Sequence, residues 1–348
     1  VDMGAVQTVW WSWDPNRSLS PKQLASRIIT VSRLLRPGGH FFFSCQEGLG
    51  SPLHGYMQQA FEVSAVAHHN GAFWVYTCRR PSEPLDCAPF PGVVRVPLGN
   101  KGLAIWTRNP AEAALMYREI FIEQCYTPDN LVLQWQQKPV LMVDAGANLG
   151  LFCIYLHCCN VKGTCLAFEP AAESYKLSVR NLRECGITVV EHGEQLEGID
   201  AVDTQAGLVV HIFCLALSAS DFGVRVPFTF YPHTSANSSF ASLETPAFLH
   251  GAEAQTVEVT CCRLSEVLDK VVDSSADIDL LKVDVEGAEL EVLRGLDRSH
   301  TAQVHNIAIE TTQDGATELS ELLQQNGFPG KISVASHPEC SGQWILTG

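Results

Sequence analysis

An acid and a glycine-containing turn directly follow an apolar segment of strand length at residues 140–143. The acid is Asp144, and the turn carries three residues at alternating positions: Gly146, Asn148 and Gly150. Glycine permits positive φ and lets a ligand come close to the backbone. An apolar, helix-like segment covers residues 151–159. Strand, tight turn and helix together are typical of the front edge of a nucleotide-type pocket.

The identity of the acid bears on which ligand this turn would hold. Dinucleotide folds usually carry Gly-x-Gly-x-x-Gly and bind a pyrophosphate at the helix N-terminus. Here Phe152 and Cys153 follow Gly150, so the third glycine is absent. Asp144, two residues before Gly146, would repel phosphate and attract a cation. S-adenosylmethionine offers a sulfonium and an ammonium and has no phosphate, so the acid favours it. A strand-to-helix turn without a ligand is the alternative.

A second acid ends the next expected strand, at residues 165–168. Glu169 follows Gly146 by 23 residues. At this distance a parallel sheet returns an acid to a ribose, whose paired hydroxyls one carboxylate can accept. The alternative is an acid at a strand end without a ligand.

Two further acids lie in a block at residues 278–296. An expected buried strand ends at Asp284, and Glu286 lies in the turn to a helix that ends at Gly295. A carboxylate here can take the proton from a hydroxyl group. An equal alternative is that both acids only cap the helix or bind substrate. The sequence supplies no complete set of metal ligands at this pair.

These motifs resemble the FkbM family of S-adenosylmethionine-dependent methyltransferases. The similarity runs from about residue 119 to the C-terminus, with its most specific piece at residues 282–289. The other matching segments are 143–150, 167–170, 216–218, 237–243 and 327–328. The resemblance implies O-methylation of a hydroxyl, often on a sugar or polyketide-type product. Members of the family occur as free-standing enzymes and inside synthases.

The resemblance also implies roles for individual residues. The methionine end of the cofactor would be lined by Asp144, Gly146, Asn148 and Gly150. Glu169 would hold the ribose, while Ala216 and Leu217 would flank the adenine. Asp284 and Glu286 would face the substrate. Residues 188–207 form an additional acidic segment, interpreted as an insertion or a lid, which leaves the position of the third strand open.

The expected fold is α/β, a class I methyltransferase Rossmann-like sandwich with a mostly parallel, seven-stranded sheet and helices on both faces. It would occupy residues 101–348, with a proline-rich linker at 83–100. Residues 1–82 resemble the C-terminal half of a class I methyltransferase, with strands at 6–11, 41–45 and 73–78 and a helix near 56–65. No glycine-rich loop precedes this partial unit, so we assign it no catalysis.

Composition narrows the classes of partner. The net charge is −15 and no dense Lys/Arg run appears, which argues against nucleic acid. No apolar run approaches the length that spans a bilayer, so no membrane partner is expected. Thirteen scattered cysteines indicate reduced thiols and a cytoplasmic setting. The start at Val1 suggests a piece of a longer polypeptide with neighbouring domains.

Three functions therefore remain open. The first is a methyltransferase acting on a small-molecule or glycan hydroxyl. The second is a non-catalytic, degenerate methyltransferase-like module, which would not bind S-adenosylmethionine. The third is a nicotinamide-dependent oxidoreductase, whose melting temperature NADH rather than S-adenosylmethionine would raise. Asp144 and the missing third glycine argue against the third.

Overall fold

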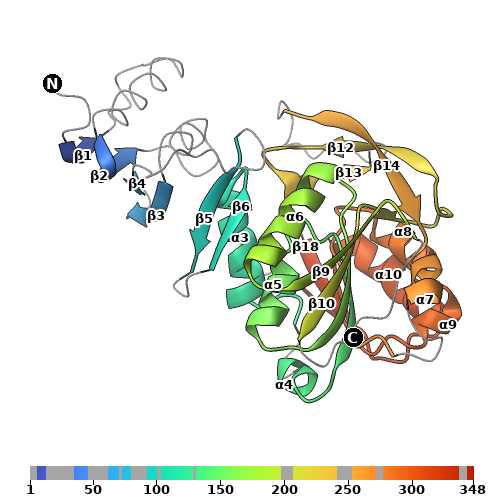
Figure 1. The fold of residues 1–348 in the computed structure, drawn as a ribbon. Coiled ribbons are helices and arrows are strands. Elements are labelled where there is room, and N and C mark those ends of the chain that lie inside the picture. Colours follow the sequence, from blue (N-terminus) through green and yellow to red (C-terminus); the bar gives the residue numbers. More distant parts are fainter. Residues whose placement is uncertain are drawn as a thin grey trace. The chain divides into compact units, whose positions relative to one another are not determined.

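The structure is a computed structural model. It describes residues 6–12, 35–45, 62–69, 73–79, 92–99, 103–127, 131–196, 207–240, 253–271, 277–336 and 343–348. The chain divides into two compact units, Val1–Leu115 and Met116–Gly348 (Figure 1). Each unit is considered by itself below.

The first unit contains a four-stranded sheet and a hairpin. The sheet comprises β1 (Val6–Ser12), β2 (Leu35–Cys45), β3 (Glu62–His69) and β4 (Phe73–Arg79), in the order β1-β2-β4-β3. β1 and β2 are parallel, whereas β4 is antiparallel to both of its neighbours. The hairpin joins β5 (Val94–Leu98) to β6 (Leu103–Thr107). The prediction of a helix near 56–65 is wrong for residues 62–65, which belong to strand β3 and pair with β4. Residues 56–61 lie outside the described residues.

Between residues 103 and 139, the described part of the chain contains three helical segments. α3 (Pro110–Tyr117) begins at a proline, and the Asn109 side-chain oxygen accepts from the backbone N–H of Ala111 at 3.0 Å. This contact satisfies a donor that the first helical turn leaves without a backbone partner. A π-helical turn, η1 (Arg118–Ile122), and α4 (Leu131–Trp135) follow.

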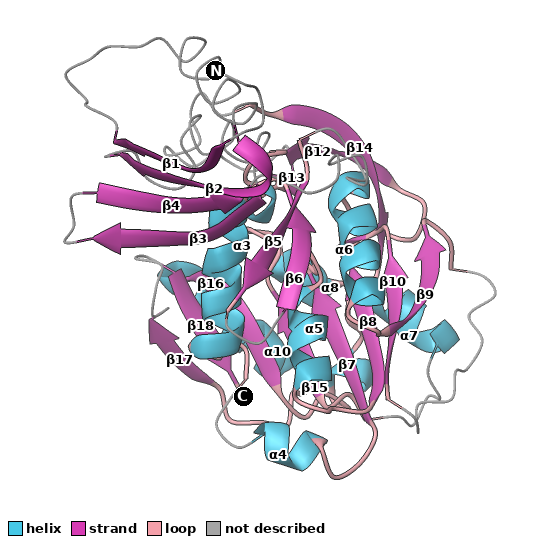
Figure 2. Cartoon of the chain, turned by 60° about the vertical axis from the view of Figure 1, so that its left-hand side comes forward, coloured by secondary structure: helices cyan, strands magenta, loops and turns pink. Residues whose placement is uncertain are grey.

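The second unit is built on an eight-stranded, mostly parallel sheet (Figure 2). Its order is β17-β18-β16-β15-β7-β8-β10-β9. The strands are β7 (Val140–Ala145), β8 (Gly163–Phe168), β9 (Thr188–Gly193), β10 (Leu208–Phe213), β15 (Leu280–Val283), β16 (Ile307–Thr312), β17 (Ser333–Ser336) and β18 (Gln343–Thr347). β18 runs antiparallel to β16 and β17. The α/β sandwich is as predicted.

The eighth strand corrects the expected count of seven. β9 pairs in parallel with β10 and forms the edge of the sheet. Val189 and Val190 are β-branched and pair with Val210 and His211, so this part of the additional segment extends the sheet instead of forming a lid. Residues 197–206 lie outside the described residues. The third strand expected from the resemblance is therefore β10.

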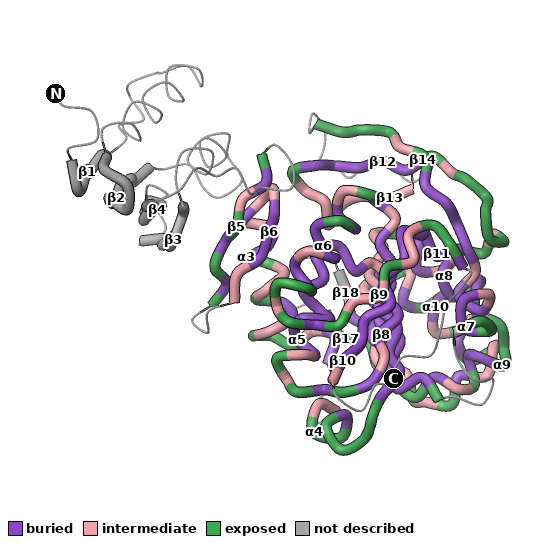
Figure 3. Tube along the Cα trace, viewed as in Figure 1, coloured by how far each residue is buried: buried purple, intermediate pink, exposed green. Residues whose placement is uncertain are grey.

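Helices cover both faces of the main sheet. α5 (Leu151–Cys158) and α6 (Ala172–Glu184) contact β10, while α8 (Glu289–Arg294) and α10 (Gln313–Gln325) contact β16 (Figure 1). Leu141, Val143 and Ala145 join the core cluster that also contains residues of α7 (Leu264–Val271), α8 and α10. Because side chains alternate along a strand, Met142 and Asp144 belong to the opposite face. The central strands β7, β10 and β15 are buried along their length (Figure 3).

A second, four-stranded sheet lies beyond β10 in the chain. Its order is β11-β14-β12-β13, with bounds Ala216–Leu217, Gln255–Cys262, Arg225–Phe230 and Ser239–Phe240. A short 3-10 turn, η2 (Ser235–Asn237), connects β12 to β13. In the part of the chain that the structure describes, no helix is both long and apolar enough to cross a bilayer.

Candidate active site

The glycine turn joins the ends of three neighbouring strands. Gly146 has φ +84, and its N–H donates to Phe168 O of β8 at 3.0 Å. A Cβ added to Gly146 would lie 1.8 Å from the backbone oxygen of Asp284, at the end of β15. Only glycine fits this close approach. Gly150 has φ +81 at the start of α5, where a Cβ would lie 2.7 Å from Ser178 Oγ.

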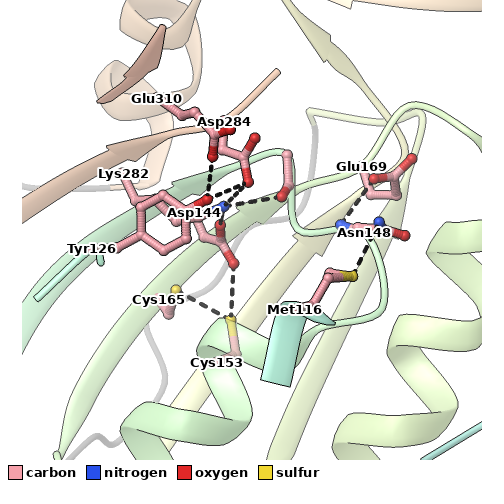
Figure 4. A network of polar contacts seen from close by, with 11 residues as sticks. Met116, Tyr126, Asp144, Asn148, Cys153, Cys165, Glu169, Lys282, Asp284 and Glu310 are labelled. Atoms are coloured by element: carbon pink, nitrogen blue, oxygen red, sulfur yellow. Dashed lines mark hydrogen bonds and ion pairs between the residues drawn. The ribbon is translucent and has the colours of Figure 1, made fainter. Parts of the chain in front are cut away.

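Asp144 forms a buried ion pair with Lys282. The register of β7 and β15 makes the two residues direct neighbours on one face of the sheet. Lys282 Nζ lies 2.9 Å from Asp144 Oδ1 and 3.1 Å from the carbonyl oxygen of Gly146 (Figure 4). The Asp144 side chain is 0% exposed and that of Lys282 3%. Burial alone would lower the pKa of Lys282, but the carboxylates of Asp144 and Asp284 raise it overall, so the ammonium keeps its charge.

The role expected for Asp144 needs correction. Oδ1 contacts Lys282, Cys153 Sγ lies 3.7 Å from Oδ2, and the side chain reaches no surface. A direct contact with the methionine end of a cofactor does not fit this burial. Asp144 instead forms an ion pair with Lys282. The Lys282 ammonium also donates to the Gly146 carbonyl and so stabilises the glycine turn.

Glu169 connects the end of β8 to the glycine turn. Its Oε2 accepts from the backbone N–H of Asn148 and its Oε1 from that of Ala171, each at 2.9 Å. The residue is 7% exposed, and burial raises the pKa of Glu169 to about 7, although both backbone bonds act in the opposite direction. The acid thus lies beside the turn, as the sequence predicted, and its orientation is set by two backbone donors.

The Asn148 side chain links the turn to two other segments. Ser235 Oγ of η2 donates to Asn148 Oδ1 at 2.9 Å, and Asn148 Nδ2 lies 3.7 Å from Met116 Sδ. Asn148 itself has φ +43. The segment between β12 and β13 therefore contacts the glycine turn through η2.

The two residues expected beside the adenine have different surroundings. Both lie in β11, which pairs in parallel with β14, and each is 4% exposed. Ala216 shares a buried cluster with Ala171, two residues beyond Glu169. Leu217 packs into the main core of the second unit. Alternation along the strand separates the two side chains, so they do not form one surface.

The expected proton-accepting residues lie at the end of β15. Asp284 is 26% exposed at its side chain, and its Oδ2 lies 3.5 Å from Lys282 Nζ. Glu286 is partly exposed and has φ +54 in the turn to α8. The buried Glu289 accepts from the Gly287 N–H at 2.7 Å and so braces this turn. Asp284 joins the site around the glycine turn, whereas Glu286 follows in the loop.

Three residues of the site were given no role in the sequence prediction. Lys282, Tyr126 and Glu310 surround Asp284, with the Tyr126 hydroxyl 3.0 Å from Asp284 Oδ2 and 2.6 Å from Glu310 Oε2 (Figure 4). A charge inside the apolar segment 280–283 was a usable signal for Lys282. Tyr126 lies outside the quoted motifs and carried no such signal.

Comparison with known proteins decides the family. The family model for the methyltransferase FkbM domain matches residues 144–329 of this sequence. The chain belongs to the FkbM methyltransferase family. Methyltransferase sdnD of Sordaria araneosa is 34% identical over an alignment of 248 residues, and the match covers 65% of this chain and 86% of that protein. The 31-O-demethyl-FK506 methyltransferase FkbM of Streptomyces tacrolimicus is 28% identical, over 63% and 83% of the two chains.

Membership of this family, together with the topology of the main sheet, confirms the predicted fold class. This FkbM methyltransferase is an α/β protein of the class I methyltransferase fold, with a large, mostly parallel sheet. The crystal structure of methyltransferase FkbM from Methylobacillus flagellatus KT is 17% identical, with a TM-score of 0.38; the matched part covers 60% of this chain and 43% of that one.

Proposed function

We propose that this methyltransferase transfers the methyl group of S-adenosylmethionine to a hydroxyl of a small molecule, a sugar or a polyketide-type product. The observation that carries the proposal is the glycine turn after β7 together with the acids that follow its two neighbouring strands, Glu169 after β8 and Asp284 after β15. This edge suits a cationic cofactor without phosphate. The name of the Streptomyces relative, which describes an O-demethylated substrate, supports oxygen as the acceptor atom.

The residues at this edge of the sheet would bind S-adenosylmethionine and align its methyl group with the acceptor hydroxyl. The glycine turn would approach the methionine part, Glu169 would accept from the ribose hydroxyls, and Ala216 would lie near the adenine. Methyl transfer is an in-line displacement, so catalysis depends mainly on alignment. The acceptor oxygen forms a bond to the methyl carbon while the carbon–sulfur bond breaks and its electron pair stays on sulfur. Asp284, partly exposed and held by Tyr126 and Lys282, would take the hydroxyl proton.

Calorimetry on the full chain tests the cofactor. We expect S-adenosylmethionine and S-adenosylhomocysteine to bind and NADH to give no heat. Binding of NADH alone would favour an oxidoreductase, and binding of none of the three would favour a non-catalytic module. Incubation with S-adenosylmethionine labelled in its methyl group and a panel of hydroxyl, amine and carboxylate acceptors then tests the acceptor atom. Labelled ethers support the proposal, whereas labelled amines or base-labile esters contradict it.

Cofactor affinity should rise with pH through about 7. Ribose hydroxyls donate to an ionised carboxylate, so binding favours the charged form of Glu169, and burial raises the pKa of Glu169 to about 7 in the free protein. Binding therefore releases a proton below that pH, and the dissociation constant of S-adenosylmethionine should fall as the pH rises from about 6 to about 8. Titration calorimetry in buffers of different ionisation enthalpy measures both effects. Glu169→Gln should bind S-adenosylmethionine more weakly, and its affinity should no longer depend on pH in this range. If the variant kept the pH profile of the wild type, Glu169 would not be the residue that holds the ribose.

A further inference from the structure

Tyr126 lies between two carboxyl groups at the edge of the proposed active site. Its hydroxyl oxygen is 2.6 Å from Glu310 Oε2 and 3.0 Å from Asp284 Oδ2. A phenol carries one proton and can donate to only one of these oxygens. If both carboxyl groups were ionised, the other contact would bring lone pairs of Tyr126 against a negatively charged oxygen. A second proton, on one of the two carboxyl groups, turns both contacts into hydrogen bonds.

The surroundings place this second proton on Glu310. Asp284 is 26% exposed at its side chain and lies 3.5 Å from the Lys282 ammonium, so its negative charge is both hydrated and compensated. Burial raises the pKa of Glu310 to about 8, and the negative charge of Asp284 adds to this effect. The titratable groups that act on Glu310 or respond to it are Tyr126, Asp284, Glu119 of η1, Lys282 and Cys125.

The register of the sheet explains why these groups meet. Lys282 pairs with Ala308 and Val283 with Ile309, which places Asp284 level with Glu310 at the end of adjacent parallel strands. Side chains two residues apart share a face, so Lys282, Asp284 and Glu310 project to the same side of the sheet. Tyr126 packs onto this side, and the Lys282 ammonium lies 5.0 Å from the centre of its ring.

We propose that Glu310 is a positioning residue carried as a neutral carboxylic acid, which donates to the Tyr126 hydroxyl while Tyr126 donates to the Asp284 carboxylate. The proposal rests on the proposed function, in which Asp284 accepts the proton of the acceptor hydroxyl. The chain of two hydrogen bonds gives the Asp284 carboxylate a donor and sets its orientation. When Glu310 ionises, Tyr126 turns its proton to Glu310, and Asp284 loses this donor.

Infrared titration of the full chain tests the protonation state directly, without an acceptor substrate. The spectrum of the wild type minus that of Glu310→Gln isolates the residue from Glu169 and Glu289, whose pKa burial also raises. We expect a protonated-carboxyl band at pH 7 that disappears with a midpoint near pH 8. In Tyr126→Phe the band should shift, because the acid has lost its acceptor. A difference spectrum that shows an ionised carboxylate at pH 7 would overturn the proposal.

Stability against pH supplies a second readout. A carboxyl group whose pKa is raised in the folded state binds a proton there that the unfolded chain has lost, so the wild type loses stability as the pH rises from about 4.5 to about 8. Glutamine keeps a donor toward Tyr126 and does not titrate. The melting temperature of Glu310→Gln should therefore rise relative to the wild type across this range. A constant difference would count against the proposal. Calorimetry with S-adenosylmethionine tests the proposed function separately, because Glu310 has no assigned contact with the cofactor.

Discussion

Replacing Lys282 by methionine is expected to lower the free energy of unfolding by about 3–5 kcal/mol, because it leaves a buried carboxylate without its partner. Lys282 Nζ is 2.9 Å from Asp144 Oδ1, and the two side chains are 3% and 0% exposed. The substitution also removes the donor to the Gly146 carbonyl, so cofactor binding should weaken with it. Urea denaturation monitored by circular dichroism, together with calorimetry, measures the two effects.

Two controls identify the cause of this loss. The double variant Asp144→Asn/Lys282→Met removes both charges and should recover a large part of the lost stability, which a double-mutant cycle reports as coupling. Arg294→Met breaks an ion pair with Glu291 whose side chains are 48% and 42% exposed, and should cost less than about 1 kcal/mol. Equal losses for Lys282→Met and Arg294→Met would show that the buried pair has no special role.

Gly146→Ala is expected to abolish cofactor binding and to destabilise the second unit. The new Cβ would lie 1.8 Å from the backbone oxygen of Asp284, so the ends of β7 and β15 must separate. Such overpacking costs about 1–3 kcal/mol, and the positive φ adds about 1–2 kcal/mol for a residue with a Cβ. Calorimetry with S-adenosylmethionine and urea denaturation measure the two losses.

Gly186→Ala is the matched control for this variant. Gly186 has φ +80 after α6, close to the +84 of Gly146, but a Cβ there would meet nothing within 4 Å. Gly186→Ala should therefore lose only the stability that a positive φ costs a residue with a Cβ, without a steric clash. Its affinity for the cofactor should be unchanged. If Gly146→Ala bound the cofactor as tightly as Gly186→Ala, the glycine turn would not be the cofactor site.

The sequence predicted those parts of the site that depend on local pattern. An apolar segment that ends in Asp144 and a turn with Gly146 and Gly150 is readable from neighbouring residues alone, and the position of Glu169 follows from the usual length of a strand–helix–strand unit. Glu169 duly lies against this turn. The α/β class and most strands followed from the same local signals.

What the sequence did not show depends on register and on distant contacts. The neutralisation of Asp144 follows from its pairing with Lys282, 138 residues later, and a shift of one residue would have placed Lys282 on the other face. Tyr126 reaches Asp284 across 158 residues. For the same reason Ala216 and Leu217 were predicted as one surface, although the strand directs their side chains to different cores.

The buried pair also constrains how this protein can diverge. A homologue that has lost only Asp144 keeps the Lys282 ammonium buried without a partner. A homologue that has lost only Lys282 keeps the Asp144 carboxylate buried without a partner. Either intermediate is selected against, so the two positions should be inherited together or exchanged together. Among homologous sequences they should covary more strongly than Arg294 does with Glu291, whose partnership water can replace.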